Sequence, residues 1–186
     1  MLSWSKTNIP PDTVVARNMC SSLLEYLIKY THHTNRSVLK NNLQVIKTLL
    51  QVWKDRLQIP YQLIHTFFNK KDPDKKDNST GLQLLGLVIK AGFSPFSPQN
   101  VGLSKHEFFT HLTNCLHFKY KEVYATAAEV CGLALNYYQE HQEENELDFL
   151  LGNVSQELAN HSKKNKDMLV LCVFHMQTYY PNIVDR

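Results

Sequence analysis

Apolar residues along this chain recur three and four positions apart, the spacing that places them on one face of a helix. No stretch alternates apolar and polar residues for long enough to form a convincing strand. The pattern therefore predicts an all-α chain. Helices are expected at about residues 10–30, 36–57, 60–68, 79–91, 104–117, 119–138, 146–162 and 165–180.

Local signals mark the ends of several of these helices. Ser104 and Glu107 have the spacing of a capping box, in which each side chain accepts a hydrogen bond from the backbone amide of the other residue. Gly92 suits the left-handed position that commonly ends a helix. Pro60 disfavours helix at the residue before it, so the second helix is expected to stop near residue 57.

The charged stretch NKKDPDKKDNST, residues 69–80, separates two apolar segments. Its four lysines are matched by three aspartates, so it is neither a polybasic signal nor a strong phosphate site. Pro73 cannot continue a helix, and Asn78 or Ser79 can cap the next one. The stretch is therefore predicted to be a loop within the second helical pair.

The predicted helices fall into four antiparallel pairs, at about 10–57, 60–92, 104–141 and 146–180. The pairs open roughly 40 to 50 residues apart, which is the period of HEAT-type repeats. No tetratricopeptide or ankyrin pattern is present. We therefore expect residues 1–186 to form one α-solenoid of HEAT-like pairs, with a compact helical bundle as the alternative.

Three of the predicted helices have faces suited to packing. On a helical wheel, the apolar residues of 36–57 span an arc of roughly 160°, wider than the roughly 100° stripe of a helix that faces one core. Such an arc favours a helix placed between neighbouring repeats, and a central bundle helix has one too. The first helix is expected to carry Val15, Met19, Leu23, Leu24 and Leu27 on one face, and the helix at 119–138 to present the small residues Ala125, Ala127, Ala128, Gly132 and Ala134.

Composition limits the class of protein. Hydrophobic residues make up 43% of the chain and charged residues 20%, an ordinary globular composition. No apolar run approaches the roughly 18 residues of a membrane span, and the first residues lack the pattern of a secretory signal. Four scattered cysteines without close pairing favour reduced thiols in an intracellular compartment.

The formal net charge of +3 is too small to indicate a nucleic-acid partner, but it is unevenly distributed. Residues 1–77 carry 12 basic and 6 acidic side chains, whereas residues 78–186 carry 8 and 11. Arg36, Lys40, Lys47 and Lys54 lie within about 40° of one another on the wheel of their helix, and we call them the basic stripe. The stripe could follow a phosphate backbone, with a slope of log K against log salt near about −3.6. The other interpretation is a solvated rim beside the apolar arc.

Histidine and cysteine positions invite a metal hypothesis that their spacing does not support. His111, Cys115 and His117 are close in sequence, and Cys172 and His175 are three positions apart. A structural zinc site needs four converging ligands, and an i, i+4 pair on one helix supplies only two. Buried thiols and ordinary imidazoles are the simpler interpretation, so no metal ligand is predicted.

The chain carries no recognisable catalytic motif. A glycine-rich phosphate loop, kinase motifs, a nucleophile elbow and a zinc-protease motif are all missing from the sequence. The acidic stretch QEHQEENELD, residues 139–148, is predicted to be a solvated turn between helices rather than a pair of catalytic carboxylates. No catalytic residue, cofactor site or small-molecule substrate is therefore predicted for these residues.

Several long stretches resemble one known family: RSVLKNNLQVIKTLLQVWKDRLQIPYQLI, KDPDKKDNSTGLQLLGLVI, YKEVYATAAEVCGLAL and the final IVDR. They are similar to the large helical region of the DNA-dependent protein kinase branch of the phosphatidylinositol-3-kinase-related kinases. The resemblance runs from Arg36 to Arg186, and we extend it to the whole chain.

This resemblance implies a fragment of a HEAT-repeat solenoid in a giant Ser/Thr protein kinase, whose kinase domain lies far C-terminal and outside these residues. It implies a nuclear location and a role in repair of DNA double-strand breaks by non-homologous end joining. The implied partners are the rest of the solenoid, the Ku heterodimer and DNA ends. Kinases of this family favour Ser or Thr followed by Gln, which makes Ser155 a candidate phosphorylation site.

Three hypotheses for function follow from the sequence. The leading one is a non-catalytic scaffold and interaction segment of such a kinase. The alternative is a nucleic-acid-binding helical module that uses the basic stripe. A third, an independent metal-dependent enzyme, would require stoichiometric zinc.

Overall fold

The structure is a computed structural model that describes residues 14–31, 35–68, 75–97 and 103–184. All regular structure in these ranges is helical, which confirms the predicted all-α class. The α-helices are α2 (Val14–Lys29), α3 (Arg36–Val52), α4 (Tyr61–Phe68), α5 (Lys75–Lys90), α6 (Lys105–Asn114), α7 (Lys121–Glu140), α8 (Glu144–Lys164) and α9 (Lys166–Gln177). Short 3-10 helices follow α3, α6 and α9, namely η1 (Lys54–Arg56), η2 (Cys115–His117) and η3 (Pro181–Val184).

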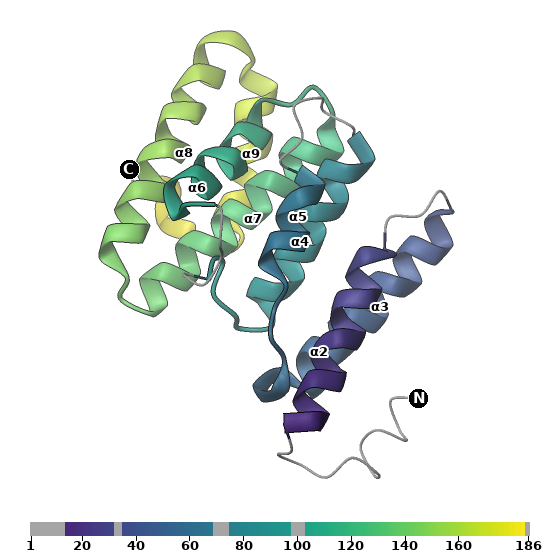
Figure 1. Ribbon diagram of the computed structural model, residues 1–186. Coiled ribbons are helices and arrows are strands. Elements are labelled where there is room, and N and C mark those ends of the chain that lie inside the picture. Colours follow the sequence, from purple (N-terminus) through teal and green to yellow (C-terminus); the bar gives the residue numbers. More distant parts are fainter. Residues whose placement is uncertain (1–13, 32–34, 69–74, 98–102, 185–186) are drawn as a thin grey trace.

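The helices stack in chain order into an α-solenoid (Figure 1). α5, α7 and α9 form one layer, in which α5 packs against α7 and α7 packs against α9. α4 packs against α5, while α6 and α8 pack against each other and against α7. α2 and α3 lie together at one end of the stack, where α3 contacts α5 and α2 contacts α4.

One continuous hydrophobic core joins these helices, and α7 lies at its centre. The small residues of α7 allow this position, because Ala127, Ala128, Gly132 and Ala134 are all buried. A Cβ atom built on Gly132 would lie only 2.6 Å from the carbonyl oxygen of Met176 in α9. The predicted close approach of neighbouring helices to the small-residue face is therefore confirmed.

Two helix ends follow the local signals in the sequence. Ser104 Oγ accepts a hydrogen bond from the Glu107 amide at 3.2 Å, and the Ser104 amide donates to Glu107 Oε2 at 2.8 Å, so the predicted capping box is present. Gly92 has a φ of +87°, and the amide of Phe93 donates to the carbonyl of Val88 at 3.2 Å. Gly92 thus ends α5 in the left-handed conformation that its sequence position predicts.

The start of α5 differs from the prediction. The helix begins at Lys75, so Asn78 and Ser79 lie inside it and do not cap it. Both side chains are buried, and the Ser79 hydroxyl accepts a hydrogen bond from Gln83 Nε2 at 3.0 Å. Packing of this turn against the rest of the protein outweighs the preference of Asn and Ser for helix ends. Part of the predicted loop, residues 69–74, lies outside the described residues.

The first two helices also correct the sequence analysis. α3 ends at Val52 rather than near residue 57, because Trp53 leaves helical geometry and is buried in a small cluster with Cys20 and Leu49. In α2 the buried residues are Ala16, Cys20, Leu24 and Ile28, so only Leu24 of the predicted apolar face is fully buried, and Val15 and Met19 lie outside the core. Their side chains are 66% and 57% exposed, because α2 has packing partners on only one side within the described residues.

Candidate functional site

The basic stripe was the surface with the strongest sequence signal, and all four of its side chains are exposed. Arg36, Lys40 and Lys47 lie on α3, whereas Lys54 lies in η1. Asn35 caps the start of α3, since its side chain accepts a hydrogen bond from the amide of Ser37 at 2.9 Å. A rise of about 1.5 Å per residue gives the stripe a length of about 25 Å.

The two ends of the stripe contact neighbouring helices. Arg36 Nη2 lies 3.6 Å from Glu122 Oε1 in the first turn of α7. Lys54 lies against Gly92 at the end of α5, with its Nζ atom 2.5 Å from the position that a Cβ on Gly92 would take. The ion pair is exposed and contributes little stability by itself. It nevertheless partly neutralises the stripe and leaves Lys40 and Lys47 as the residues that face solvent without such a contact in the described part of the chain.

The stripe borders a groove of about 240 Å³ between α3, α5 and α7. Leu43 from the middle of α3 lines the groove, together with Leu82, Gln83, Gly86, Leu87, Lys90, Thr126, Glu129 and Val130. Leucine and valine side chains make up about half of this lining, and its one acidic residue, Glu129, is paired with Lys90.

A polar network that the sequence did not reveal joins the α5, α7 and α9 layer. Lys90 Nζ donates to Glu129 Oε1 at 2.5 Å, and the hydroxyl of Tyr179 donates to the same oxygen at 3.2 Å. Lys90 Nζ also lies 5.2 Å from the centre of the Tyr179 ring. Burial by itself lowers the pKa of Lys90, but hydrogen bonds and charge at Glu129 and Tyr179 outweigh burial and raise it. Only the tertiary structure brings these residues together, since they are far apart in sequence.

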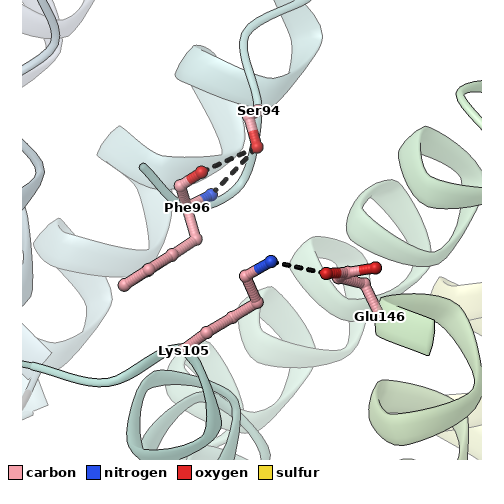
Figure 2. A network of polar contacts seen from close by, with 4 residues as sticks. All are labelled: Ser94, Phe96, Lys105 and Glu146. Carbon is pink, nitrogen blue, oxygen red and sulfur yellow. Dashed lines mark hydrogen bonds and ion pairs between the residues drawn. The ribbon is translucent and has the colours of Figure 1, made fainter. Parts of the chain in front are cut away.

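A second ion pair joins α6 and α8 (Figure 2). Lys105 Nζ at the start of α6 donates to Glu146 Oε1 in the first turn of α8 at 2.5 Å. The hydrogen bond from Lys105 lowers the pKa of Glu146, so this carboxylate is held ionised. Nearby, Ser94 Oγ donates to the carbonyl of Phe96 at 2.8 Å and shapes the chain after α5.

A cavity of about 620 Å³ lies beside Lys105 of this pair. Tyr61, Phe96, Lys105, Tyr138 and Glu143 are among its lining residues. Burial raises the pKa of both tyrosines well above the usual range, so their hydroxyls stay protonated. The amine of Lys105, which lines the cavity, is held by Glu146.

The cysteines and histidines considered for a metal site do not converge. Cys115 Sγ donates to the carbonyl of His111 at 3.4 Å, and burial raises the pKa of the Cys115 thiol to about 12. Burial likewise raises the pKa of the Cys172 thiol to about 11, so both are neutral and poor metal ligands. His117 instead pairs with Glu157 of α8. Within the ranges that the structure describes, no group of three or more His, Cys, Asp or Glu residues is arranged to hold a metal ion.

Ser155, the candidate phosphorylation site, is exposed in the middle of α8. A kinase binds its substrate peptide in an opened conformation, so this stretch of helix would have to unwind for modification. The modification of Ser155 stays a prediction. In the described helices, none is both long and apolar enough to cross a membrane.

Comparison with known proteins identifies the family of the chain. A sequence profile described as "DNA-PKcs, CC5" matches residues 21–186. The chain belongs to the DNA-PKcs CC5 family. Its DNA-PKcs relatives include the DNA-dependent protein kinase catalytic subunits of Mus musculus and Xenopus laevis, each 39% identical over the whole chain. The Gallus gallus protein of the same name is 38% identical, also over the whole chain. The chain spans about 4% of the length of these relatives, so it corresponds to a fragment of DNA-PKcs.

Proposed function

We propose that this chain is a non-catalytic scaffold segment of a DNA-dependent protein kinase, built from HEAT-type helix pairs that continue into further repeats. The observation that carries the proposal is the outer face of α9. Met168, Cys172 and Met176 bury one face of this helix, while Val170 and Phe174 on the other face are 67% and 57% exposed. A helix that is apolar on all sides is normally buried on all sides.

The other end of the stack supports the same proposal. Val38, Val45 and Val52 follow one another at seven-residue spacing along α3 and are 37%, 39% and 37% exposed. Tyr26 and Tyr30 of α2 are exposed as well, at 61% and 53%. Soluble proteins rarely leave several large apolar side chains exposed together, and terminal solenoid repeats normally present a polar outer face. Exposed apolar faces at both ends suit an internal segment.

Family membership supports the wider role that we propose for the intact protein. In this proposal the parent chain is a Ser/Thr protein kinase whose kinase domain lies outside these residues. It acts in the nucleus in repair of DNA double-strand breaks by non-homologous end joining, with the Ku heterodimer and DNA ends as partners. The segment itself contributes shape and packing surfaces to that kinase and has no substrate or cofactor.

Direct nucleic-acid binding by the basic stripe is the less favoured alternative. Arg36 is paired with Glu122, which leaves three of the four cations without an acidic partner in the described structure. Three cations neutralise fewer phosphates than the roughly 6 to 10 contacts through which nucleic-acid-binding proteins gain a large, salt-dependent affinity.

The scaffold proposal is tested by solvent labelling of α9 in the intact kinase. Hydroxyl radicals should modify Phe174 weakly in the full-length chain, because a neighbouring repeat covers it. Exposed Tyr120 serves as an internal reference, since its side chain is 44% exposed at the start of α7. If Phe174 were instead labelled at the rate expected for a side chain that is 57% exposed, no repeat would pack there. That result would overturn the proposal.

A further inference from the structure

We propose that the helix covering α9 carries an acidic residue in its first turn, which pairs with lysines at the start of α9, and apolar residues that pack on Val170 and Phe174. The inference rests on the proposed function, because it names the chemistry of the repeat that continues the solenoid. Two independent features of α9, its apolar face and a basic corner at its start, point to this partner.

The outer face of α9 combines charge and apolar surface in one line. Lys166, Val170 and Phe174 are spaced four residues apart, so they lie along the same side of the helix, and all three are exposed. A partner helix laid along this line meets a positive charge at one end and two large apolar side chains beyond it. An amphipathic helix with apolar residues three or four positions apart fits such a surface.

The start of α9 is the centre of a basic corner formed by Lys119, Lys121, Lys163, Lys164 and Lys166, all of them exposed. The connection from α6 to α7 meets the connection from α8 to α9 here. His161 Nε2 lies 3.0 Å from the carbonyl oxygen of Leu116, and the rings of His117 and His161 are 5.3 Å apart.

The carboxylates beside the basic corner leave part of its charge uncompensated. Glu122 contacts Arg36 and Glu157 contacts His117, so Asp167 is the remaining acidic side chain on these two connections. In the described structure the five lysines outnumber the three carboxylates, so the corner keeps a positive charge toward which an acidic partner would be steered.

The helices α5, α7 and α9 run in the same direction, which explains why an acidic residue in the first turn of a covering helix would reach the basic corner. Gly86 of α5 faces Val130 and Leu133 of α7, while Gly92 shares a pocket with Tyr137 and Glu140 farther along α7, so these two helices run parallel. α9 follows the same direction, since Met176 lies at Gly132 and Asn182 lies at Gln139. A further helix of this layer would therefore begin at the edge where α9 begins.

The contact that we propose has a precedent inside the segment. Arg36 at the start of α3 lies 3.6 Å from Glu122 in the first turn of α7. α5, α7 and α9 each carry an acidic residue in the first turn, namely Asp77, Glu122 and Asp167. A carboxylate in this position is also favoured by the dipole of its own helix. Because α5, α7 and α9 join the layer in chain order, the covering helix should come from the same polypeptide, after residue 186.

The intact kinase allows a direct test with a zero-length carbodiimide reagent, which joins a lysine amine to a carboxylate in contact with it. We expect a crosslink from Lys163, Lys164 or Lys166 to an Asp or Glu located after residue 186 of the same chain. The Lys105–Glu146 pair, at 2.5 Å, should crosslink in the same sample and provides the positive control. Lys166→Arg keeps the charge but removes the reactive amine, so crosslinks from position 166 should disappear without any change in stability.

A second measurement separates this inference from the scaffold proposal. A photoreactive benzophenone side chain in place of Phe174 should capture the residues that cover the apolar face. Capture of a later helix of the same chain that carries no acid near the lysines would overturn the inference but leave the scaffold proposal standing. Carbodiimide crosslinks to a separate protein, or protection of the lysines by nucleic acid alone, would also overturn the inference. If position 174 captured nothing and stayed solvent-labelled, both would be wrong.

Discussion

Gly132 of α7 lies directly on the backbone of Met176 in α9, and this contact sets the distance between the two helices. A Cβ atom on Gly132 would be 2.6 Å from the carbonyl oxygen of Met176 and 3.0 Å from its Cα atom. Backbone atoms cannot move aside as a flexible side chain can. The separation of α7 and α9 therefore depends on the absence of a side chain at residue 132.

Gly132→Ala should destabilise the packing of α9 on α7. Overpacking of a tight contact costs about 1 to 3 kcal/mol, and the gain in helix propensity from Gly to Ala returns about 1 kcal/mol at most. We expect a net loss of up to about 2 kcal/mol of local stability, measured by amide hydrogen exchange in α7 and α9.

Gly152→Ala is the matched control for this substitution. Gly152 is an exposed residue of α8, and a Cβ atom there would meet nothing within 4 Å. The same chemical change should therefore stabilise α8 by about 0.5 to 1 kcal/mol. Equal effects at residues 132 and 152 would contradict the steric argument.

Gln142→Gly should stabilise the turn between α7 and α8. Gln142 has a φ of 57°, in the left-handed region, and the amide of Glu143 donates to the carbonyl of Tyr138 at 2.9 Å. Glycine adopts this conformation without the cost of about 1 kcal/mol that a side chain imposes. Slower amide exchange of Glu143 would report the gain. Gly92→Ala, at a φ of 87°, should show the opposite sign, and stabilisation there would contradict the prediction.

His65 should make the stability of the segment depend on pH. The side chain is only 4% exposed, and its ring lies 4.4 Å from that of Phe108 and 6.2 Å from that of Phe96. Burial, aided by the charge of His111, lowers the pKa of His65 from 6.5 to about 4. Between these two pH values His65 binds a proton in the unfolded chain but not in the folded chain. The free energy of unfolding therefore decreases as the pH falls from about 6.5 to about 4.

The size of this effect can be checked with His65→Phe. The pKa difference corresponds to at most about 3 kcal/mol, which the wild type should lose across that window. The variant should lose less, because phenylalanine cannot be protonated and fits the same aromatic surroundings. Burial also lowers the pKa of His161, so a smaller pH dependence should remain. If the stability of the wild type and of the variant depended on pH in the same way, His65 would not be the cause of the pH dependence.

Charge reversal of Lys40 and Lys47 distinguishes the scaffold function from nucleic-acid binding. These two residues are the exposed part of the basic stripe without a neighbouring contact in the described structure. If the segment is a scaffold, Lys40→Glu with Lys47→Glu should leave the DNA affinity of the intact kinase and its salt dependence unchanged. If the stripe binds phosphates, the salt slope should fall in magnitude by about 2, which titrations at several salt concentrations would detect.

Local chemistry explains which features were predictable from residues close in sequence. The capping box at Ser104 and Glu107 and the stop at Gly92 depend on backbone groups within one turn, so their residue types suffice. The same reasoning failed at Asn78 and Ser79, where burial of a whole turn outweighed the preference for a cap. It also could not distinguish Gln142, whose φ of 57° is imposed by the turn between two packed helices.

The candidate surfaces also divide into features that the sequence predicts and features that only tertiary contacts create. The basic stripe is visible on a helical wheel, but the contacts of Arg36 with Glu122 and of Lys54 with Gly92 cross between helices and have no signal in the sequence. The outer face of α9 could have been found, because the run MLVLCVF is apolar on every side of a helix. The basic corner could not, since its lysines come from two connections that meet through tertiary contacts such as that of His161 with Leu116.

By itself, the sequence determined that the chain is helical, where most of its helices lie and which family it belongs to, because periodicity and local capping act over a few residues and the resemblance runs along the chain. The tertiary structure alone decided which faces are buried, which charges are paired and which apolar surfaces are left for further repeats. These outcomes depend on the approach of helices far apart in sequence, and the energy of such an approach comes from packing and desolvation between surfaces that no short stretch contains.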